Sequence, residues 1–151
     1  MKKTVIHATA GTLAMLLVTC FWTSTLVSEL FFDDLTVTYV KQVIAKYGLV
    51  CLVLAMAATG GSGFALSKGR TGRLIEEKQK RMPFLGANGV LIMIPAAIYL
   101  SVKATAGQFD SLFYVVQAVE LIVGLVQLTL LGKNFKAGLR LSGRLCPNCT
   151  Q

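Results

Sequence analysis

One carboxylic acid stands inside a long apolar segment near the C-terminal end of this 151-residue chain. Glu120 lies within the run Val115–Leu131, and no other charged residue interrupts that run. Gln117, Gly124 and Gln127 lie at helical spacing on the same face. A carboxylate at bilayer depth is costly unless it is paired or protonated, so its position predicts a functional group. We expect Glu120 to be protonated at rest, because burial disfavours the charged form.

The polar stripe formed by Gln117, Glu120 and Gln127 has three competing interpretations. In the first, the side chains hold neighbouring helices together through hydrogen bonds worth ~0.6 kcal/mol each on average. In the second they form a face on which another subunit docks, and in the third they line a path for protons or cations. Candidate partners for Glu120 are polar residues of the other apolar segments: Asn88, Thr19, Thr23 and Lys46.

Ligands for a metal or a haem are few. His7 is the only histidine, so a b-type haem would need a second axial ligand, for which Met82 lies at a similar depth. Cys146 and Cys149 form a CxxC motif near the C-terminus, but a four-coordinate zinc site needs two further ligands. We therefore predict no haem, zinc or other cofactor, and His7, Cys146 and Cys149 are the remaining metal candidates.

These residues belong to, or adjoin, four apolar runs of bilayer-crossing length. The runs cover residues 5–27, 43–66, 84–102 and 112–131, and a spanning helix needs about 20 mostly apolar residues. The chain is 54% hydrophobic and 15% charged, with a mean hydropathy of +0.65, whereas soluble domains carry about 25% charged residues. We predict an all-α membrane protein, in which residues 1–151 form one domain with four transmembrane helices arranged as two hairpins.

The basic residues gather on one side of these runs. Lys2 and Lys3 precede the first run, a basic loop spans residues 68–81, and further basic residues follow the fourth run. Cytoplasmic segments carry an excess of Lys and Arg, so both termini are expected in the cytoplasm of a bacterium, with the chain in its inner membrane. This placement accounts for the formal net charge of +8. We therefore expect contact with anionic lipid and no nucleic-acid partner.

The segment after the fourth run has its own pattern. Four basic residues recur there at helical spacing, which predicts a short basic helix over residues 133–145 on the inner leaflet. Its expected headgroup contacts are Lys133, Lys136, Arg140 and Arg144. Residues 146–151 are predicted to form a flexible tail.

Two patterns bear on how the helices are arranged. The run Phe32-Asp33-Asp34-Leu35 is echoed by Phe109-Asp110-Ser111-Leu112 at a matching topological position, which suggests a weak tandem pseudo-repeat. Ala57 and Gly61 have the spacing that lets membrane helices approach closely, and we expect the second and third spans to pack tightly there.

No catalytic constellation is present, because the chain lacks the His, Ser or paired-carboxylate motifs that an enzyme would use. The hairpin topology and the Gly/Arg-rich loop resemble those of small four-helix proteins of the bacterial inner membrane, a group whose members carry no assigned activity and so transfer no site residue. We expect a protein that is not an enzyme and serves as an accessory or assembly subunit, in contact with other membrane subunits or with itself. The alternative is a small proton- or cation-coupled transporter or channel that uses Glu120, and the third interpretation is a b-type haem protein.

Overall fold

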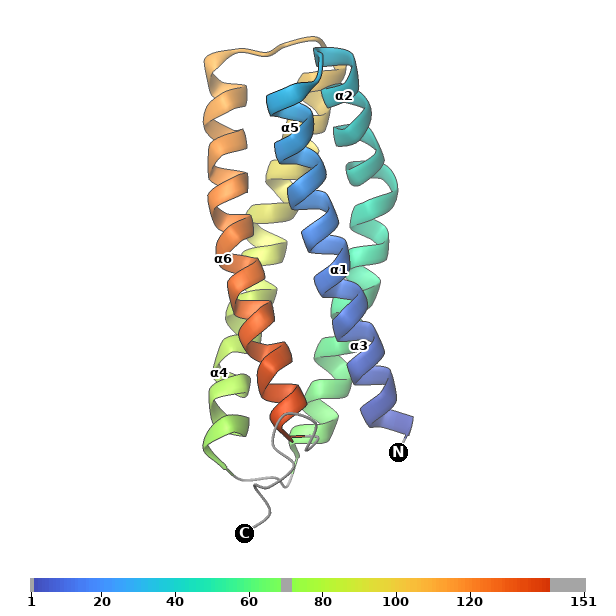
Figure 1. Cartoon of the computed structure of the whole chain (residues 1–151), viewed down its shortest axis with the longest axis vertical. Coiled ribbons are helices and arrows are strands. Elements are labelled where there is room, and N and C mark those ends of the chain that lie inside the picture. The colour runs from blue at the N-terminus through green and yellow to red at the C-terminus, as the bar shows by residue number, and fades with distance from the viewer. Residues whose placement is uncertain (1, 69–71, 142–151) are drawn as a thin grey trace.

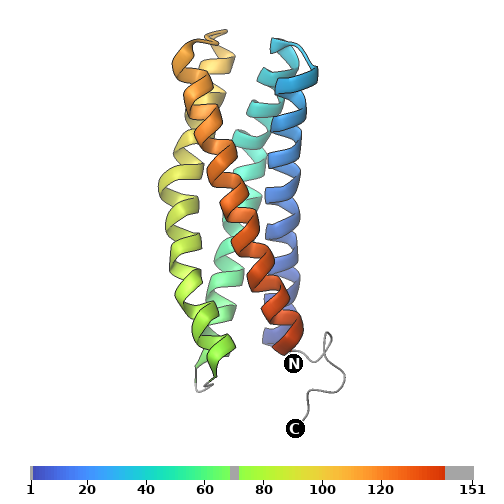
Figure 2. The same ribbon diagram turned by 60° about the vertical axis from the view of Figure 1, so that its left-hand side comes forward.

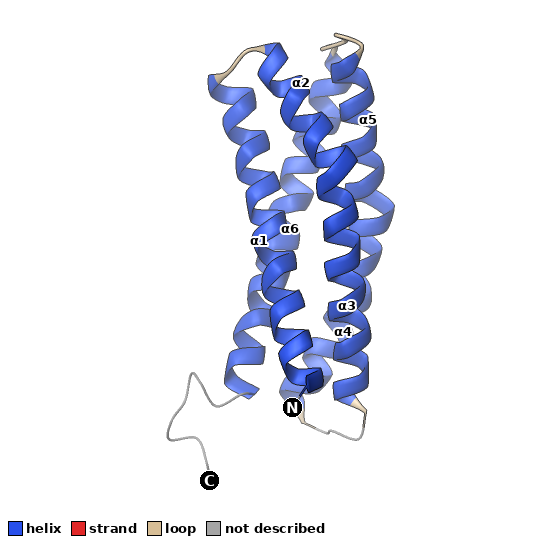
Figure 3. Ribbon diagram, turned by 90° about the vertical axis from the view of Figure 1, so that its right-hand side faces the viewer, coloured by secondary structure: helices blue, strands red, loops and turns tan. Residues whose placement is uncertain are grey.

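The computed structural model describes residues 2–68 and 72–141, and every regular element in this part of the chain is a helix (Figures 1 and 3). In chain order the elements are α1 (Lys2–Phe31), α2 (Asp34–Val43), η1 (Ile44–Gly48), α3 (Leu49–Ser67), α4 (Arg73–Asn88), η2 (Gly89–Met93), α5 (Ile94–Thr105) and α6 (Ser111–Leu141). The elements α2, η1 and α3 form one continuous rod, and α4, η2 and α5 form another.

Four helical rods are long and apolar enough to cross a membrane: Thr4–Phe31, Asp34–Ser67, Ile75–Thr105 and Ser111–Arg140. Most of their large apolar side chains point outwards and are exposed, among them Leu16, Leu54, Leu91 and Ile122. Such a surface is stable only against lipid, because in water it would stay unburied. The helix lengths and compositions therefore confirm the predicted class, an all-α multi-pass membrane protein.

The second, third and fourth rods extend well beyond the predicted spans. The second begins at Asp34, where the apolar pattern alone predicted Val43, and the third begins at Ile75 in place of Phe84. α6 continues to Leu141 without a break, so residues 133–141 prolong the fourth rod. The helices are longer because backbone hydrogen bonding carries each of them through polar residues outside the apolar runs, and residues 133–141, for which a separate basic helix was predicted, are a continuation of α6. The predicted flexible tail and Arg144 lie outside the described residues.

The bundle has two distinct ends, which we name after what they carry. The hairpin end holds the connection between α1 and α2 and the connection between α5 and α6, and the terminal end holds the start of α1 and the end of α6 (Figure 1). α6 crosses the bundle obliquely, from beside α5 at the hairpin end to beside α1 at the terminal end (Figure 2). α6 therefore packs against the first and third rods, and it reaches the second rod through a side-chain contact of its polar face.

Each rod that starts at the hairpin end is capped by an aspartate. The Asp33 carboxylate accepts a hydrogen bond from the backbone N–H of Thr36, at 3.1 Å, and another from its hydroxyl. The Asp110 carboxylate accepts one from the backbone N–H of Phe113 at 2.9 Å. Carboxylates satisfy the orphan N–H groups of a first helical turn and interact favourably with its dipole. The echo between residues 32–35 and 109–112 therefore has a local cause, the need to cap two helices.

Replacing Asp33 by alanine is expected to lower the stability of the bundle and to speed amide exchange in the first turn of α2. The Thr36 hydroxyl and backbone N–H hold the pKa of Asp33 below its usual range. A carboxyl whose pKa is lowered on folding stabilises the fold above its unfolded-state pKa, and that contribution disappears as the pH falls through the lowered value. Hydrogen exchange at neutral pH is the measurement. Asp34→Ala is the matched control, and equal losses from the two variants would contradict the capping role.

The packed core is divided between the two halves of the bundle. At the hairpin end, Val37, Leu100, Ala104 and Phe113 pack together, and Leu100 and Phe113 are completely buried. We call this cluster the hairpin-end core. Further along, Val18, Leu85 and Leu131 form a second cluster on α1, α4 and α6. The hairpin-end core joins α2, α5 and α6, so it closes the interior at that end.

Two π-helical turns interrupt the second and third rods. η1 begins directly after Val43, one turn beyond Lys41, and η2 begins directly after Asn88. Pro95 follows η2, and a proline cannot donate the backbone hydrogen bond that a regular helix requires. π-helical turns occur frequently at functional sites because they re-aim the neighbouring side chains. η1 lies beside the buried Lys41 and η2 beside the buried Asn88, so these two residues are candidates for a functional site.

Within the glycine-rich stretch of α3, Gly63 lies close to Met82 of the third rod, as predicted for this stretch, but Gly61 does not. A methyl group added to Gly61 would meet nothing within 4 Å, so this residue makes no close contact with the third rod. α3 packs mainly against α1. On α1, a Cβ atom added to Gly11 would lie 3.5 Å from the methyl group of Thr59 on α3. Small residues on α3 therefore allow close approach to the third rod at Gly63, as predicted, while most of the packing of α3 is against α1, which was not predicted.

Candidate functional site

A buried ion pair joins the second and fourth rods. Lys41 Nζ lies 2.9 Å from Glu120 Oε2, and their side chains are 2% and 12% exposed. An ion pair withdrawn from water persists only when each charge compensates the other. Glu120 therefore lies against the Lys41 ammonium group, a contact that the sequence did not predict.

The partner of Glu120 differs from every candidate named above. Lys46 is exposed, Asn88 bonds to another residue, and the hydroxyls of Thr19 and Thr23 donate to carbonyls of their own helix. The apolar run 43–66 leaves Lys41 outside the span, in the segment that connects the first two runs. The helix actually begins at Asp34, so Lys41 lies two turns inside it.

The ion pair belongs to a layer of buried polar residues to which all four rods contribute. At ~1.5 Å per residue, these side chains lie roughly 5–14 Å from the hairpin end. We call them the polar layer: Thr25, Ser28, Lys41, Ser101, Gln117 and Glu120. The Ser28 hydroxyl donates to the Thr25 carbonyl at 3.0 Å, within α1. Polar residues from four helices within the same part of an apolar bundle indicate a site, because packing alone would favour apolar side chains.

Several polar atoms at this level lack a hydrogen-bond partner within the described residues. Both amide atoms of Gln117 are buried and unpartnered, and Gln117 is only 4% exposed. Glu29 Oε1 and the Tyr99 hydroxyl are buried without a partner as well. Native proteins leave few such atoms, and those that remain point to a ligand, a water or an ion. This half of the bundle therefore has unused hydrogen-bonding capacity around the ion pair.

The predicted polar stripe is divided between two sites. Gln117 and Glu120 belong to the polar layer, whereas Gln127 lies deeper and accepts a hydrogen bond from Asn88 Nδ2 at 2.8 Å. Gln127 Nε2 in turn donates to the carbonyl of Leu85 at 3.2 Å. This second site joins α4 to α6, and its groups satisfy one another. It matches the interpretation of the stripe as a link between helices; at the Glu120 end the link is an ion pair, and both amide atoms of Gln117 beside it have no partner within the described residues.

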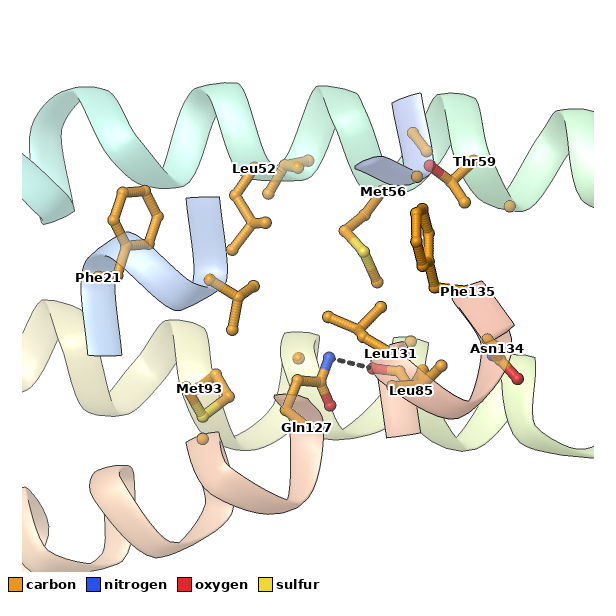
Figure 4. Close-up of a pocket in the computed structure, with 18 of the residues that line it drawn as sticks. Phe21, Leu52, Met56, Thr59, Leu85, Met93, Gln127, Leu131, Asn134 and Phe135 are labelled. Atoms are coloured by element: carbon orange, nitrogen blue, oxygen red, sulfur yellow. Dashed lines mark hydrogen bonds between the residues drawn. The ribbon is translucent and has the colours of Figure 1, made fainter. Parts of the chain in front are cut away.

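An elongated cavity of about 570 Å³ runs along the bundle from the polar layer to the terminal end. Thr25 and Glu120 line one end of the cavity, and Thr4 and Leu139 line the other. Its walls are almost entirely apolar: Leu52 and Met56 of α3 face Leu131 and Phe135 of α6 across the space (Figure 4). Binding pockets for small molecules typically have this size and this kind of lining. The cavity leads directly to the Glu120 carboxylate.

Two aromatic residues of α1 line the cavity close to its Glu120 end. The Trp22 indole donates a hydrogen bond from Nε1 to the Leu121 carbonyl at 2.9 Å, and its ring fits against Gly124. Phe21 fits against Gly48 of η1 in the same way. Neither glycine leaves room for a Cβ atom beside the ring, since the closest ring atoms would lie 2.8 Å and 2.6 Å away. The two glycines therefore fix where these rings stand.

Replacing Gly124 by alanine is expected to displace the Trp22 ring and weaken its bond to the Leu121 carbonyl. Trp22 is the only tryptophan of the chain, so its fluorescence reports this change directly. We expect a shifted emission maximum for Gly124→Ala. Gly132→Ala is the matched control, because a methyl group there would meet nothing within 4 Å on the same helix. An unchanged spectrum for Gly124→Ala would contradict the described contact.

His7 and Met82 meet at the terminal end of the cavity, which both of them line. A methyl group on Gly63 would lie 3.0 Å from His7 Cε1 and 2.9 Å from Met82 Cε, so the two side chains share one place. His7 Nδ1 lies 3.0 Å from the Thr59 carbonyl, to which it donates, and 3.1 Å from the Ser62 hydroxyl. These contacts do not test whether the protein binds a haem, so the expected absence of a cofactor and the third interpretation, a b-type haem protein, both stay predictions. Cys146 and Cys149 lie outside the described residues.

Comparison of the chain with protein-family models, with curated proteins and with solved structures finds no match. The site therefore rests on its own geometry. Sequence reasoning identified Glu120, Gln117, Gln127 and Asn88, and it missed Lys41 and the cavity. One signal for Lys41 was available, because Val37, Lys41 and Ile44 lie on one helix face and a capping aspartate precedes them.

Proposed function

We propose that the protein is a small proton- or cation-coupled transporter in which Glu120 is the ion-binding group. One observation carries this proposal: the buried Lys41–Glu120 pair stands at the end of a cavity that reaches the opposite end of the bundle. Intramembrane ionisable residues that pair with each other commonly mark ion and substrate pathways. The alternative role, an accessory subunit, is supported less well, because the polar face of α6 is turned into the bundle and not towards a partner.

Access to the ion pair from the two ends of the bundle is unequal. On the hairpin side, the hairpin-end core seals the interior with Leu100 and Phe113, both completely buried. On the other side, the cavity extends past Gln127 as far as Thr4 and Leu139. A binding site reached from one side at a time is what a carrier needs, since access from both sides would make a leak. The described conformation fits the state that is open towards the terminal end.

We propose that the terminal end faces the cytoplasm of a bacterium and that the chain lies in its inner membrane. The start of α1, the end of α3, the start of α4 and the end of α6 all lie at this end, and basic residues are concentrated in and around these segments of the sequence. Lys133, Lys136 and Arg140 of α6 would then meet anionic headgroups. The cavity would accordingly admit its substrate from the cytoplasmic side or release it there.

The charged groups around Glu120 determine what protonation of its carboxylate would change in the bundle. Lys41 of α2 is its partner, Glu29 of α1 lies within electrostatic reach, and the Tyr99 hydroxyl of α5 is the other titratable group at this level. Protonation of Glu120 removes its attraction for Lys41 and releases the ammonium towards Glu29. One proton therefore changes the pairing between α2 and α6, and this change would couple ion binding to a movement of these rods.

The proposal is tested by proton flux into proteoliposomes that contain a pH-sensitive dye. A pH gradient across the membrane is expected to drive dye-reported flux with the native chain, and Glu120→Gln is expected to abolish it, because an amide cannot exchange a proton. Asp110→Asn is the matched control, since Asp110 is an exposed carboxyl at the hairpin end. Equal flux for native protein and Glu120→Gln would refute the proposal and favour the accessory role.

A further inference from the structure

We infer that the cavity takes a monovalent organic cation with a bulky apolar body, and that this cation replaces Lys41 as the counterion of Glu120. The inference rests on the proposed function and names its substrate class. Three features carry it: the charge balance of the polar layer, the composition of the cavity wall and the presence of a second carboxylate for Lys41.

The charges near the ion pair do not balance. Lys41 faces two carboxylates, Glu120 at 2.9 Å and Glu29, which lies within electrostatic reach of both Lys41 and Glu120. Asp34 adds a further negative charge near Glu29. Asp34 is exposed to solvent, but with Lys41, Glu120 and the partly buried Glu29 ionised the interior here still carries one more negative than positive charge, and such an excess attracts a cation. A proton neutralises one carboxylate, and so does a ligand that brings its own positive charge.

The shape and lining of the cavity decide which kind of cation fits. A small hydrated ion gains nothing from about 570 Å³ of space with an almost wholly apolar wall. An apolar body fills that wall, and the Phe21 and Trp22 rings that line it attract positive charge through their faces. The Glu120 carboxylate lies on the cavity lining, whereas Lys41 does not, so a ligand meets the negative partner first. An anion would meet that carboxylate and be repelled.

Lys41 needs a second partner once the ligand binds Glu120. Glu29 can take that role, because its Oε1 is buried and has no hydrogen-bond partner within the described residues. The exchange keeps every charge paired: the ligand binds Glu120, and the Lys41 ammonium moves to Glu29. Binding is then an exchange of counterions, which involves no bond making and no electron transfer.

The test uses two probes of nearly equal size and apolar surface but opposite charge, tetraphenylphosphonium and tetraphenylborate. Their binding to the native chain in detergent is followed through Trp22, the only tryptophan, which lines the cavity. We expect saturable quenching by tetraphenylphosphonium, and only the unsaturable background of micelle partitioning for tetraphenylborate. Because this comparison is made on the native chain, it does not depend on how any variant folds. Equal saturable binding of both probes would overturn the inference.

Variants then locate the cation. Glu120→Gln is expected to weaken tetraphenylphosphonium binding by about 30-fold or more, as loss of one partner in a desolvated charge pair does. Glu29→Gln is expected to weaken it too, because Lys41 loses its alternative partner, while Asp110→Asn leaves it unchanged. Unaltered binding in Glu120→Gln would also overturn the inference. Proton flux without tetraphenylphosphonium binding would refute this substrate class alone, and binding without flux would refute the proposed transport alone.

Discussion

Replacing Lys41 by methionine is expected to destabilise the bundle by ~3–5 kcal/mol, the cost of leaving a buried charge without its partner. The Glu120 carboxylate would remain 12% exposed and would lose the only ion-pair partner that it has among the described residues. Methionine preserves the length and apolar stem of lysine, so the loss reports the charge and not a cavity. Unfolding in mixed micelles, monitored by circular dichroism as the fraction of sodium dodecyl sulfate rises, measures the change.

The two single variants are expected to differ. Glu120→Gln leaves Lys41 with Glu29 within reach, whereas Lys41→Met leaves Glu120 with no second cation, so the lysine variant should lose more. The double variant Lys41→Met/Glu120→Gln should recover most of the stability, because replacing both partners removes the uncompensated charge.

An exposed pair provides the control for this cycle. Lys103 and Asp110 form an ion pair at 2.6 Å near the hairpin end, and Asp110 is half exposed. The hydrogen bond from Lys103 holds the pKa of Asp110 below its usual range, and the bond from the Phe113 backbone N–H contributes less to this effect. Water screens such pairs, so Lys103→Met should change the stability little. Equal losses from Lys41→Met and Lys103→Met would show that Lys41 is not buried as described.

The contrast between Lys41 and Glu120 shows what sequence patterns can predict. Glu120 stands alone in a long apolar run, and that local signal was sufficient to identify it. Lys41 stands in a mixed segment with Thr36, Thr38 and Gln42, which looks like the end of a loop. Only the packing of α2 against α1 and α5, together with the contact of Lys41 to Glu120 of α6, makes that segment an interior one. Whether a charged residue is buried depends on contacts between distant segments, and hydropathy reads only neighbours along the chain.

The remaining features divide in the same way. The number of rods and their apolar surfaces follow from composition and length, which are local properties. Asn88 and Gln127 were recognised as polar residues within apolar runs, but their mutual bond depends on the oblique path of α6. The cavity could not be predicted at all. The cavity exists because the side chains of the four rods do not fill the space between them. How well side chains fill that space depends on the tertiary packing, which cannot be derived from the sequence pattern.

Filling the cavity from its wall is expected to stop transport while strengthening the fold. Gly60 lines the cavity, and a Cβ atom there would meet nothing within 4 Å, so a leucine has room to enter. Gly60→Leu should raise the free energy of unfolding by about 0.5–1 kcal/mol, because glycine is unfavourable inside a helix. It should also abolish flux in proteoliposomes, since the leucine side chain would occupy the route to Glu120.

Gly61→Leu is the control for Gly60→Leu, because it introduces the same side chain at the next residue of α3 but outside the cavity. Gly61 also has open space around it, but it is exposed and does not line the cavity. Gly61→Leu should therefore stabilise the helix to a similar degree and leave flux intact. Loss of flux in both variants would indicate that α3 must bend at its glycines during transport. Flux retained in Gly60→Leu would mean that the substrate does not pass through this cavity, because a more stable bundle with a narrowed interior cannot otherwise conduct as before.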